Sequence, residues 1–138
     1  YAESWGVFMQ LINIIRDVSE DAKRDRIYLP LEDLARWGIS EEDIKSGEAL
    51  LEHPGWAPFV EEYLERADGY RQRAFKLLTH LDKSARYSPA AMASFYQSIM
   101  AKISKKKGDV FSERIQLSKT EKILLAGYVY IRYRFFGF

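Results

Sequence analysis

Apolar residues recur every three or four positions along most of this 138-residue chain, which is the spacing of one face of an α-helix. The clearest such stretch runs over 58–81, and its apolar positions are Val60, Leu64, Ala67, Tyr70, Ala74, Leu77, Leu78 and Leu81. No stretch of useful length alternates with the two-residue period of a β-strand. The pattern therefore predicts an all-α fold.

Residues that start and stop helices divide the chain into segments. We expect a first helix over about 3–24 and a short one over 31–37, which Gly38 closes in a left-handed conformation. Ser40 opens a further brief helical turn, and 53–58 is expected to be a break because it holds two prolines and a glycine. Several short elements therefore separate the first helix from the long helix that follows.

The second half of the chain carries two further start signals. Ser88 before Pro89 predicts the first turn of a helix that runs to about 106 and ends at Gly108. Ser118 and Glu121 have the spacing of a capping box and predict a last helix that runs to about 135.

The first predicted helix carries a narrow row of polar side chains beside its apolar face. This polar row, with spacings of three, four and four residues, consists of Gln10, Asn13, Asp17 and Asp21. At 100° per residue its members fall within an arc of about 80°. The neighbouring sector holds the apolar stripe Leu11, Ile15, Val18 and Ala22. Such a row suits a hard cation such as Mg²⁺, which prefers carboxylate and amide oxygens and keeps other positions for water or phosphate.

The same spacing also occurs on ordinary solvated helix faces, so the spacing alone leaves both interpretations open. Two features favour a functional site. Carboxylates four residues apart on a helix repel each other unless a cation lies between them. Asp is also a poor residue for a helix interior, and such conflicts between local preference and fold are expected at functional sites.

Residues 10–30 resemble the second aspartate-rich motif of the squalene and phytoene synthase family. The resemblance rests on Gln-x-x-Asn-x-x-Arg-Asp-x-x-x-Asp followed by Arg-Ile-Tyr-Leu-Pro, with weaker likeness at 91–96 and 109–114. In that family, all-α enzymes with an isoprenoid-synthase-type helical bundle join two prenyl diphosphates head to head, and Mg²⁺ links the diphosphates to two aspartate-rich motifs. The resemblance implies a prenyltransferase that condenses farnesyl or geranylgeranyl diphosphate to a squalene- or phytoene-type product with loss of diphosphate.

The resemblance implies roles for the positions that match the family motif. It implies that Asn13, Asp17 and Asp21 bind the metal, which is Mg²⁺ with Mn²⁺ as a substitute. The implied substrate contacts are Gln10, Asn13, Arg16, Arg26 and Tyr28, and the implied catalytic residues are Asp17, Asp21, Arg16 and Tyr28. Arg16 lies about 100° around the helix from Asp17 and is expected to reach a diphosphate from the side. Asp25 departs from the family pattern as a third aspartate, and we expect it to be a solvated residue at the helix end.

One part of the family pattern is missing from the chain. The family uses two aspartate-rich motifs on facing helices, whereas the only Asp-x-x-x-Asp run here is Asp17, Asp21 and Asp25. The chain also begins at Tyr1, with no capping residue before the first helix. We therefore expect residues 1–138 to be one helical segment, the C-terminal half of a synthase domain of about 270–300 residues, and to be inactive in isolation.

Two other functions remain open on the sequence. The first is a non-catalytic helical scaffold or assembly factor that kept the fold. The second is an all-α terpene cyclase that acts on one diphosphate, although Arg-Ile-Tyr-Leu-Pro at 26–30 resembles the synthases more. The choice between farnesyl and geranylgeranyl substrates, the final product, the use of NADPH and the oligomeric state also remain open.

Composition narrows the partners of the protein. The net charge of +1 gives no bulk attraction to nucleic acid, and zero cysteines exclude a disulfide framework and suit the cytoplasm. The apolar stretch 123–138 is interrupted by Arg132 and Arg134 and is too short for a bilayer span, which needs about 20 apolar residues. We expect it to be either a buried helix or a helix at the bilayer surface, in peripheral contact with the inner face of the membrane. Prenyl diphosphates are the expected substrates.

Overall fold

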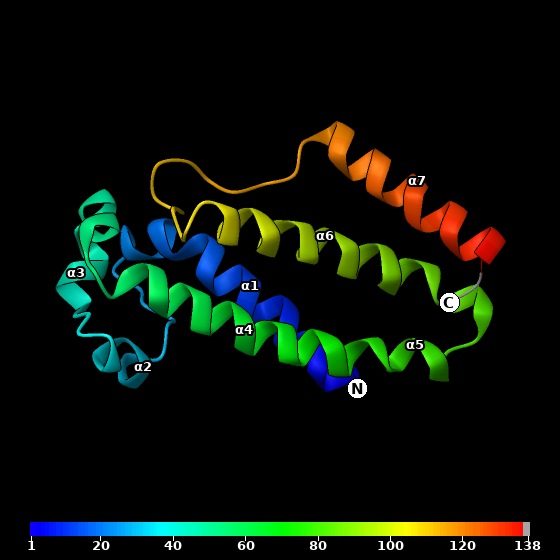
Figure 1. Ribbon diagram of the computed structural model, residues 1–138, viewed down its shortest axis with the longest axis horizontal. Coiled ribbons are helices and arrows are strands. Elements are labelled where there is room, and N and C mark those ends of the chain that lie inside the picture. Colours follow the sequence, from blue (N-terminus) through cyan, green and yellow to red (C-terminus); the bar gives the residue numbers. More distant parts are fainter. Residues whose placement is uncertain (137–138) are drawn as a thin grey trace.

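The computed structural model is all-α, as the sequence predicts (Figure 1). It describes residues 1–136, and these contain no β-strand. The elements in chain order are α1 (Ala2–Ala22), α2 (Leu31–Arg36), α3 (Glu41–Lys45), η1 (Gly47–Glu52), α4 (Trp56–Phe75), α5 (Leu77–His80), η2 (Lys83–Ala85), α6 (Tyr87–Lys105) and α7 (Lys119–Phe136). The two η elements are 3₁₀ helices.

Three long helices, α1, α4 and α6, pack against one another and share one core (Figure 1). α4 runs antiparallel to both α1 and α6, and α7 packs against α6 (Figure 1). The core is built from large side chains of all three helices, among them Phe8, Ile12, Ile15, Phe59, Tyr63 and Ile103. Burial of each such side chain stabilises the fold by about 1.5–3 kcal/mol. Most periodic apolar positions of the sequence thus share this interior, while Ala74 and Leu78 pack in a second cluster with Trp5 and Val129.

Several predicted turns and caps are confirmed. Gly38 and Gly108 both have positive φ, at 70° and 81°, as expected of glycines that end helices. A side chain at Gly108 would also collide with Val60, whose Cγ2 lies 2.7 Å from the position of an added Cβ. Ser40 and Asp43 form a reciprocal capping box at the start of α3.

The predicted break over 53–58 is shorter than expected, because α4 begins at Trp56. Pro58 fits into its first turn, where a backbone N–H has no intrahelical acceptor. The Trp56 ring is buried, and its Nε1 donates to the backbone carbonyl of Gly108, 3.0 Å away. A tertiary contact therefore favours helix where the local sequence predicts a break.

Two other predicted boundaries are wrong. The helix expected over 58–81 is divided at Lys76 into α4 and α5. Ser88 is not an N-cap, because Arg86 holds that position and Ser88 lies inside the first turn of α6. The N–H groups of a helix's first turn have no intrahelical acceptor, so proline is tolerated at each position of that turn. Pro89 therefore predicts that a helix begins nearby but not at which residue it begins.

A closed network of charges, here named the clasp, holds the short helix α2 against α4. The clasp consists of Asp33, Arg36, Glu62 and Arg66. Arg66 Nη1 and Arg36 Nη2 donate to the two oxygens of Asp33 at 2.6 and 2.8 Å. Glu62 accepts from Arg36 at 2.7 Å and from the indole N–H of Trp37 at 2.9 Å. Each carboxylate oxygen of the clasp therefore has a side-chain donor.

The last helix, α7, starts at the predicted capping box. The Ser118 hydroxyl accepts the Glu121 backbone N–H at 3.1 Å, and the Glu121 carboxylate accepts the Ser118 N–H at 2.7 Å. α7 buries Val129, but its large exposed side chains are Ile123, Leu124, Tyr128, Tyr130, Ile131 and Phe135. It is therefore not a buried helix in this chain, and contact with a bilayer surface stays a prediction. Across residues 1–136, no helix has the length and apolar character needed to cross a bilayer. Residues 137–138 of the predicted stretch lie outside the described part.

Candidate functional site

The polar row lies on α1, as the spacing predicts. All of its members except the exposed Gln10 are half-buried. The apolar stripe beside it differs from the predicted one, because Ile12 is fully buried while Leu11 and Ala22 are only half-buried. α1 contacts both α4 and α6, so its buried sector is rotated toward Ile12 relative to the prediction.

A tyrosine from α6 positions the amide of Asn13. Asn13 Nδ2 donates to Tyr96 Oη at 3.3 Å, and the Tyr96 ring packs edge-on against Phe8 with ring centroids 6.3 Å apart. The Asn13 carbonyl oxygen keeps no protein partner among the described residues, so it is available to a ligand. Tyr96 is absent from the predicted site residues, although the sequence leaves open whether it packs in the core or lines a prenyl tunnel, and it lies in the family likeness at 91–96.

Two arginines hold Asp17, the first of the two carboxylates of the polar row. Arg16 binds it side-on, with Nε 2.8 Å from Oδ1 and Nη2 2.6 Å from Oδ2. Arg114, from the loop between α6 and α7, places Nη2 3.3 Å from Oδ1. Burial alone would raise the pKa of Asp17, but the hydrogen bonds and charges of Arg16 and Arg114 outweigh it and lower this pKa. Asp17 is therefore a carboxylate at neutral pH. Arg16 was expected to reach a diphosphate from the side of the helix, but in this structure its guanidinium binds Asp17.

Arg114 is absent from the predicted site residues. It lies 97 positions from Asp17 in the sequence, so no helical spacing connects the two residues. The family likeness at 109–114 was the only signal that this loop belongs near the polar row.

A hollow of about 230 Å³ beside Asp17 is lined by cationic side chains. This basic hollow is lined by Arg16, Arg114 and Lys122, with Phe95, Ile99, Ile115, Gln116 and Leu117 completing its wall. Of the described residues, none with an acidic side chain lines it. Arg pairs two phosphate oxygens at once, and the apolar wall suits a hydrocarbon group attached to an anion. The hollow therefore fits an anion of the diphosphate kind.

The far end of the polar row meets the loop after α1. The backbone carbonyl of Asp21 accepts the N–H of Arg26 at 2.9 Å, which folds this loop back over the helix end. Asp21, Arg26 and Tyr28 consequently border one small hollow. Their side chains form no hydrogen bond or ion pair with another described residue, so they are available to ligands. Asp25 has φ 57°, is 81% exposed and pairs with Lys45 at 2.5 Å, which confirms it as a solvated helix-end residue.

The donor atoms of the polar row fit a divalent cation that also binds substrate. Residues 1–136 contain no group of three or more His, Cys, Asp or Glu side chains that could enclose a metal. The half-buried members of the row offer two carboxylates, from Asp17 and Asp21, and the amide of Asn13. Mg²⁺ is commonly held by only one or two carboxylates, with water and substrate phosphate as its other ligands. The set therefore fits Mg²⁺ in the presence of a phosphate-bearing substrate.

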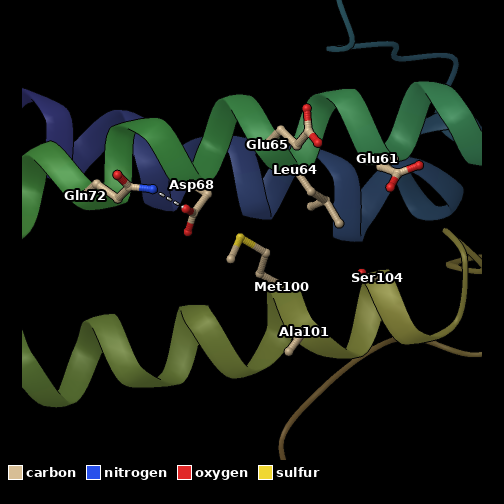
Figure 2. Close-up of a pocket in the computed structure, with 8 residues that line it drawn as sticks. All are labelled: Glu61, Leu64, Glu65, Asp68, Gln72, Met100, Ala101 and Ser104. Atoms are coloured by element: carbon tan, nitrogen blue, oxygen red, sulfur yellow. Dashed lines mark hydrogen bonds between the residues drawn. The ribbon is translucent and has the colours of Figure 1, made fainter.

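A larger hollow, of about 540 Å³, lies between α4 and α6 and includes no member of the polar row in its lining (Figure 2). In Figure 2, Leu64 and Asp68 of α4 point toward Met100 of α6. Glu61 and Glu65 add two more carboxylates to its lining. This acidic lining repels a diphosphate, so the larger hollow does not suit anion chemistry.

Known proteins match most of the chain. A family profile described as squalene/phytoene synthase matches residues 1–121. Phytoene synthase 2, chloroplastic, of Zea mays is 38% identical over 127 residues, which are 92% of this chain and 31% of that protein. Phytoene synthase, chloroplastic, of Cucumis melo is 38% identical over 120 residues, or 87% and 28% of the two chains.

A solved structure matches the fold as well. A crystal structure of a dehydrosqualene synthase in complex with ligand superposes with a TM-score of 0.82 and 26% sequence identity. The match covers 96% of this chain and 46% of that chain. This chain therefore spans less than half the length of each of these relatives, and its all-α arrangement is that of a dehydrosqualene synthase.

Proposed function

The chain belongs to the squalene/phytoene synthase family, and on this basis we propose that the complete protein joins two prenyl diphosphates head to head. The substrates are farnesyl or geranylgeranyl diphosphate, diphosphate is released, and the product is of the squalene or phytoene type. This chain supplies the second aspartate-rich motif. The observation that carries the proposal is the basic hollow, because two of its cations, Arg16 and Arg114, bind the Asp17 carboxylate of the polar row.

The basic hollow binds the diphosphate group of one substrate. Arg114 presents a planar guanidinium that pairs two phosphate oxygens, Arg16 offers the N–H groups that do not bind Asp17, and Lys122 adds a point charge. Phe95 and Ile99, on the wall of the same hollow, contact the first carbons of the prenyl chain. Support comes from the combination of three cations and an apolar wall in one hollow.

The polar row holds a divalent cation against the diphosphate. Its protein ligands are Asn13, Asp17 and Asp21, and this oxygen donor set favours Mg²⁺, with Mn²⁺ as a substitute. When bound, the cation neutralises charge on the diphosphate and makes it a better leaving group. Tyr96 positions Asn13 for this role through the hydrogen bond to its amide.

Arg26 and Tyr28 act at the far end of the polar row. The hollow that they border with Asp21 has only about 10 Å³, so it is their exposed guanidinium and phenol that donate hydrogen bonds to the departing diphosphate from outside it. The double bond of the second substrate then attacks the allylic carbon from which the diphosphate has left, and the new carbocation becomes neutral by losing a proton to the released diphosphate. Gln10, one turn before Asn13 on α1, contacts the substrate near its prenyl chain. Whether NADPH reduces the condensation product is tested by identifying that product.

The test uses the complete protein. It is incubated with farnesyl diphosphate and, separately, geranylgeranyl diphosphate, with Mg²⁺ or with EDTA, and the lipid product is identified by mass spectrometry. A product of doubled chain length that forms only with Mg²⁺ is expected. No product from either substrate, with the protein folded and metal present, would contradict the proposal and favour the non-catalytic scaffold.

A further inference from the structure

We propose that Arg114 is a displaceable counter-ion of Asp17, which neutralises this carboxylate before substrate binds and moves to the diphosphate in the basic hollow when the cation arrives. The inference rests on the proposed function and assigns a positioning role to a residue in the loop between α6 and α7. It follows from how Asp17 is paired, from the difference between its two arginines, and from what Arg114 faces.

Both carboxylate oxygens of Asp17 already have guanidinium donors. Arg16 occupies Oδ1 and Oδ2, and Arg114 shares Oδ1. A divalent cation at Asp17 would be a third positive group on this one carboxylate, and like charges at such short distances repel strongly. Asp17 can therefore bind a cation well only after one arginine has withdrawn.

Arg114 is the arginine that can withdraw. Arg16 makes two hydrogen bonds to Asp17 from the same helix, and its side chain is only 19% exposed. Arg114 makes one longer contact and is 51% exposed, and its next nearest carboxylate is that of Glu20, with Nε 3.9 Å from Oε1. Residues 106–118, which carry Arg114, belong to no helix. Arg114 therefore loses fewer contacts than Arg16 when it leaves Asp17.

The basic hollow provides the destination for Arg114. Its guanidinium already lines this hollow together with Arg16 and Lys122. A diphosphate there offers Arg114 a stronger partner than a carboxylate that it shares with another arginine. The anion thus releases Asp17 to the cation, and by linkage the cation releases Arg114 to the anion. Cation and diphosphate are coupled through this side chain in addition to their direct attraction.

The test is Arg114→Gln in the complete protein, with the two ligands measured separately. Mn²⁺ binding is followed by electron paramagnetic resonance without any phosphate, and binding of inorganic pyrophosphate is followed by calorimetry in EDTA. We expect opposite changes: Mn²⁺ binds about threefold to tenfold more tightly, because a competing charge is gone, and pyrophosphate about threefold to tenfold more weakly. Arg114→Lys, which keeps the charge, leaves the Mn²⁺ affinity within about twofold of wild type. A merely structural role for Arg114 would weaken both ligands in Arg114→Gln.

Arg36→Gln is the matched control, since Arg36 is an exposed arginine of the clasp and lies outside the basic hollow. It should change neither affinity. Suppose that Asp17→Asn abolishes Mn²⁺ binding, so that the proposed metal site stands. An Mn²⁺ affinity of Arg114→Gln equal to or below that of wild type then overturns the inference about Arg114 and leaves the proposed function intact. If Asp17→Asn binds Mn²⁺ as wild type does, the metal site of the proposed function fails and the inference fails with it.

Discussion

Two ionic clusters of this protein use the same residue types in different arrangements. In the clasp, Asp33 and Glu62 face two arginines, and each carboxylate oxygen has a donor. At the polar row, two arginines gather on Asp17, while Asp21 has no side-chain partner among the described residues. Donors and acceptors are balanced in the first cluster and unevenly distributed in the second.

This difference separates a structural network from a binding site. The clasp has a protein donor for each carboxylate oxygen, so its effect is to hold α2 against α4. At the polar row, by contrast, the side chains of Asp21, Arg26 and Tyr28 have no protein partner among the described residues, and all three border one hollow. Convergent polar groups without protein partners are what a ligand requires. Incomplete pairing therefore indicates the site better than the number of charges does.

The largest effect is expected from a substitution in the polar row. In the complete protein, Asp21→Asn removes a proposed metal-ligating carboxylate without removing a side-chain contact within the described residues. Turnover of prenyl diphosphate should fall about 100-fold or more, while the thermal midpoint stays that of wild type. Mass spectrometry of the product and circular dichroism measure the two quantities. Retained turnover would mean that Asp21 is an ordinary solvated residue and would remove the contrast with the clasp.

The next effect concerns stability and lies in the clasp. Asp33→Asn removes the charge that binds Arg36 and Arg66, and it should lower the free energy of unfolding by about 1 kcal/mol, because partly exposed ion pairs are individually weak. Urea unfolding measures this loss. Asp82→Asn is the control, since the Asp82 carboxylate has no partner in the described part of the chain. Turnover should stay unchanged, and a loss of turnover in fully folded Asp33→Asn would show that the clasp serves the site.

Acid should remove the stability difference between wild type and Asp33→Asn. The hydrogen bond from Arg66, with a further one from Arg36, lowers the pKa of Asp33 despite an opposing effect of burial. A carboxylate with a lower pKa in the folded protein stabilises it above the unfolded pKa of about 3.9, and the contribution is lost as pH falls through the folded pKa. The difference should be complete at about pH 6 and shrink below about pH 4. A difference that stays constant down to about pH 2 would contradict this assignment.

The smallest effect is expected when the stability contributions of Arg114, at the polar row, and Arg66, in the clasp, are compared. Arg114→Gln should change the free energy of unfolding by less than about 0.5 kcal/mol, because its ion pairs are exposed. Arg66→Gln should cost more, since Arg66 pairs with both Asp33 and Glu62. Urea unfolding of the two variants under the same conditions compares them. A larger loss for Arg114→Gln than for Arg66→Gln would mean that Arg114 is held in place rather than displaceable.

Most of the fold could be predicted because helix periods, caps and glycine turns are local. The capping residue Ser40 and the left-handed Gly38 are examples, since each acts on neighbours within a few positions. The predictions were wrong where distant contacts outweigh local preference. Trp56 lies in α4 because its indole hydrogen-bonds Gly108, and no local signal includes that partner.

The site residues also differ in whether local sequence could predict them. Asn13, Asp17 and Asp21 could be predicted to share a helix face because 3.6 residues per turn dictates it. Arg26 and Tyr28 follow in the next loop, and the family likeness includes them. Tyr96, Arg114 and Lys122 were not predicted as site residues, because they reach α1 through the packing of α6, α7 and the loop between them.

By itself, the sequence determined the helices and the polar row, because both depend on backbone geometry over a few residues. Only the tertiary structure decided which charges meet that row. The long loop after α6 brings Arg114 within 3.3 Å of Asp17, across 97 positions of sequence. Local spacing specifies one face of one helix, whereas the partner of that face is chosen by the shared burial of distant apolar side chains.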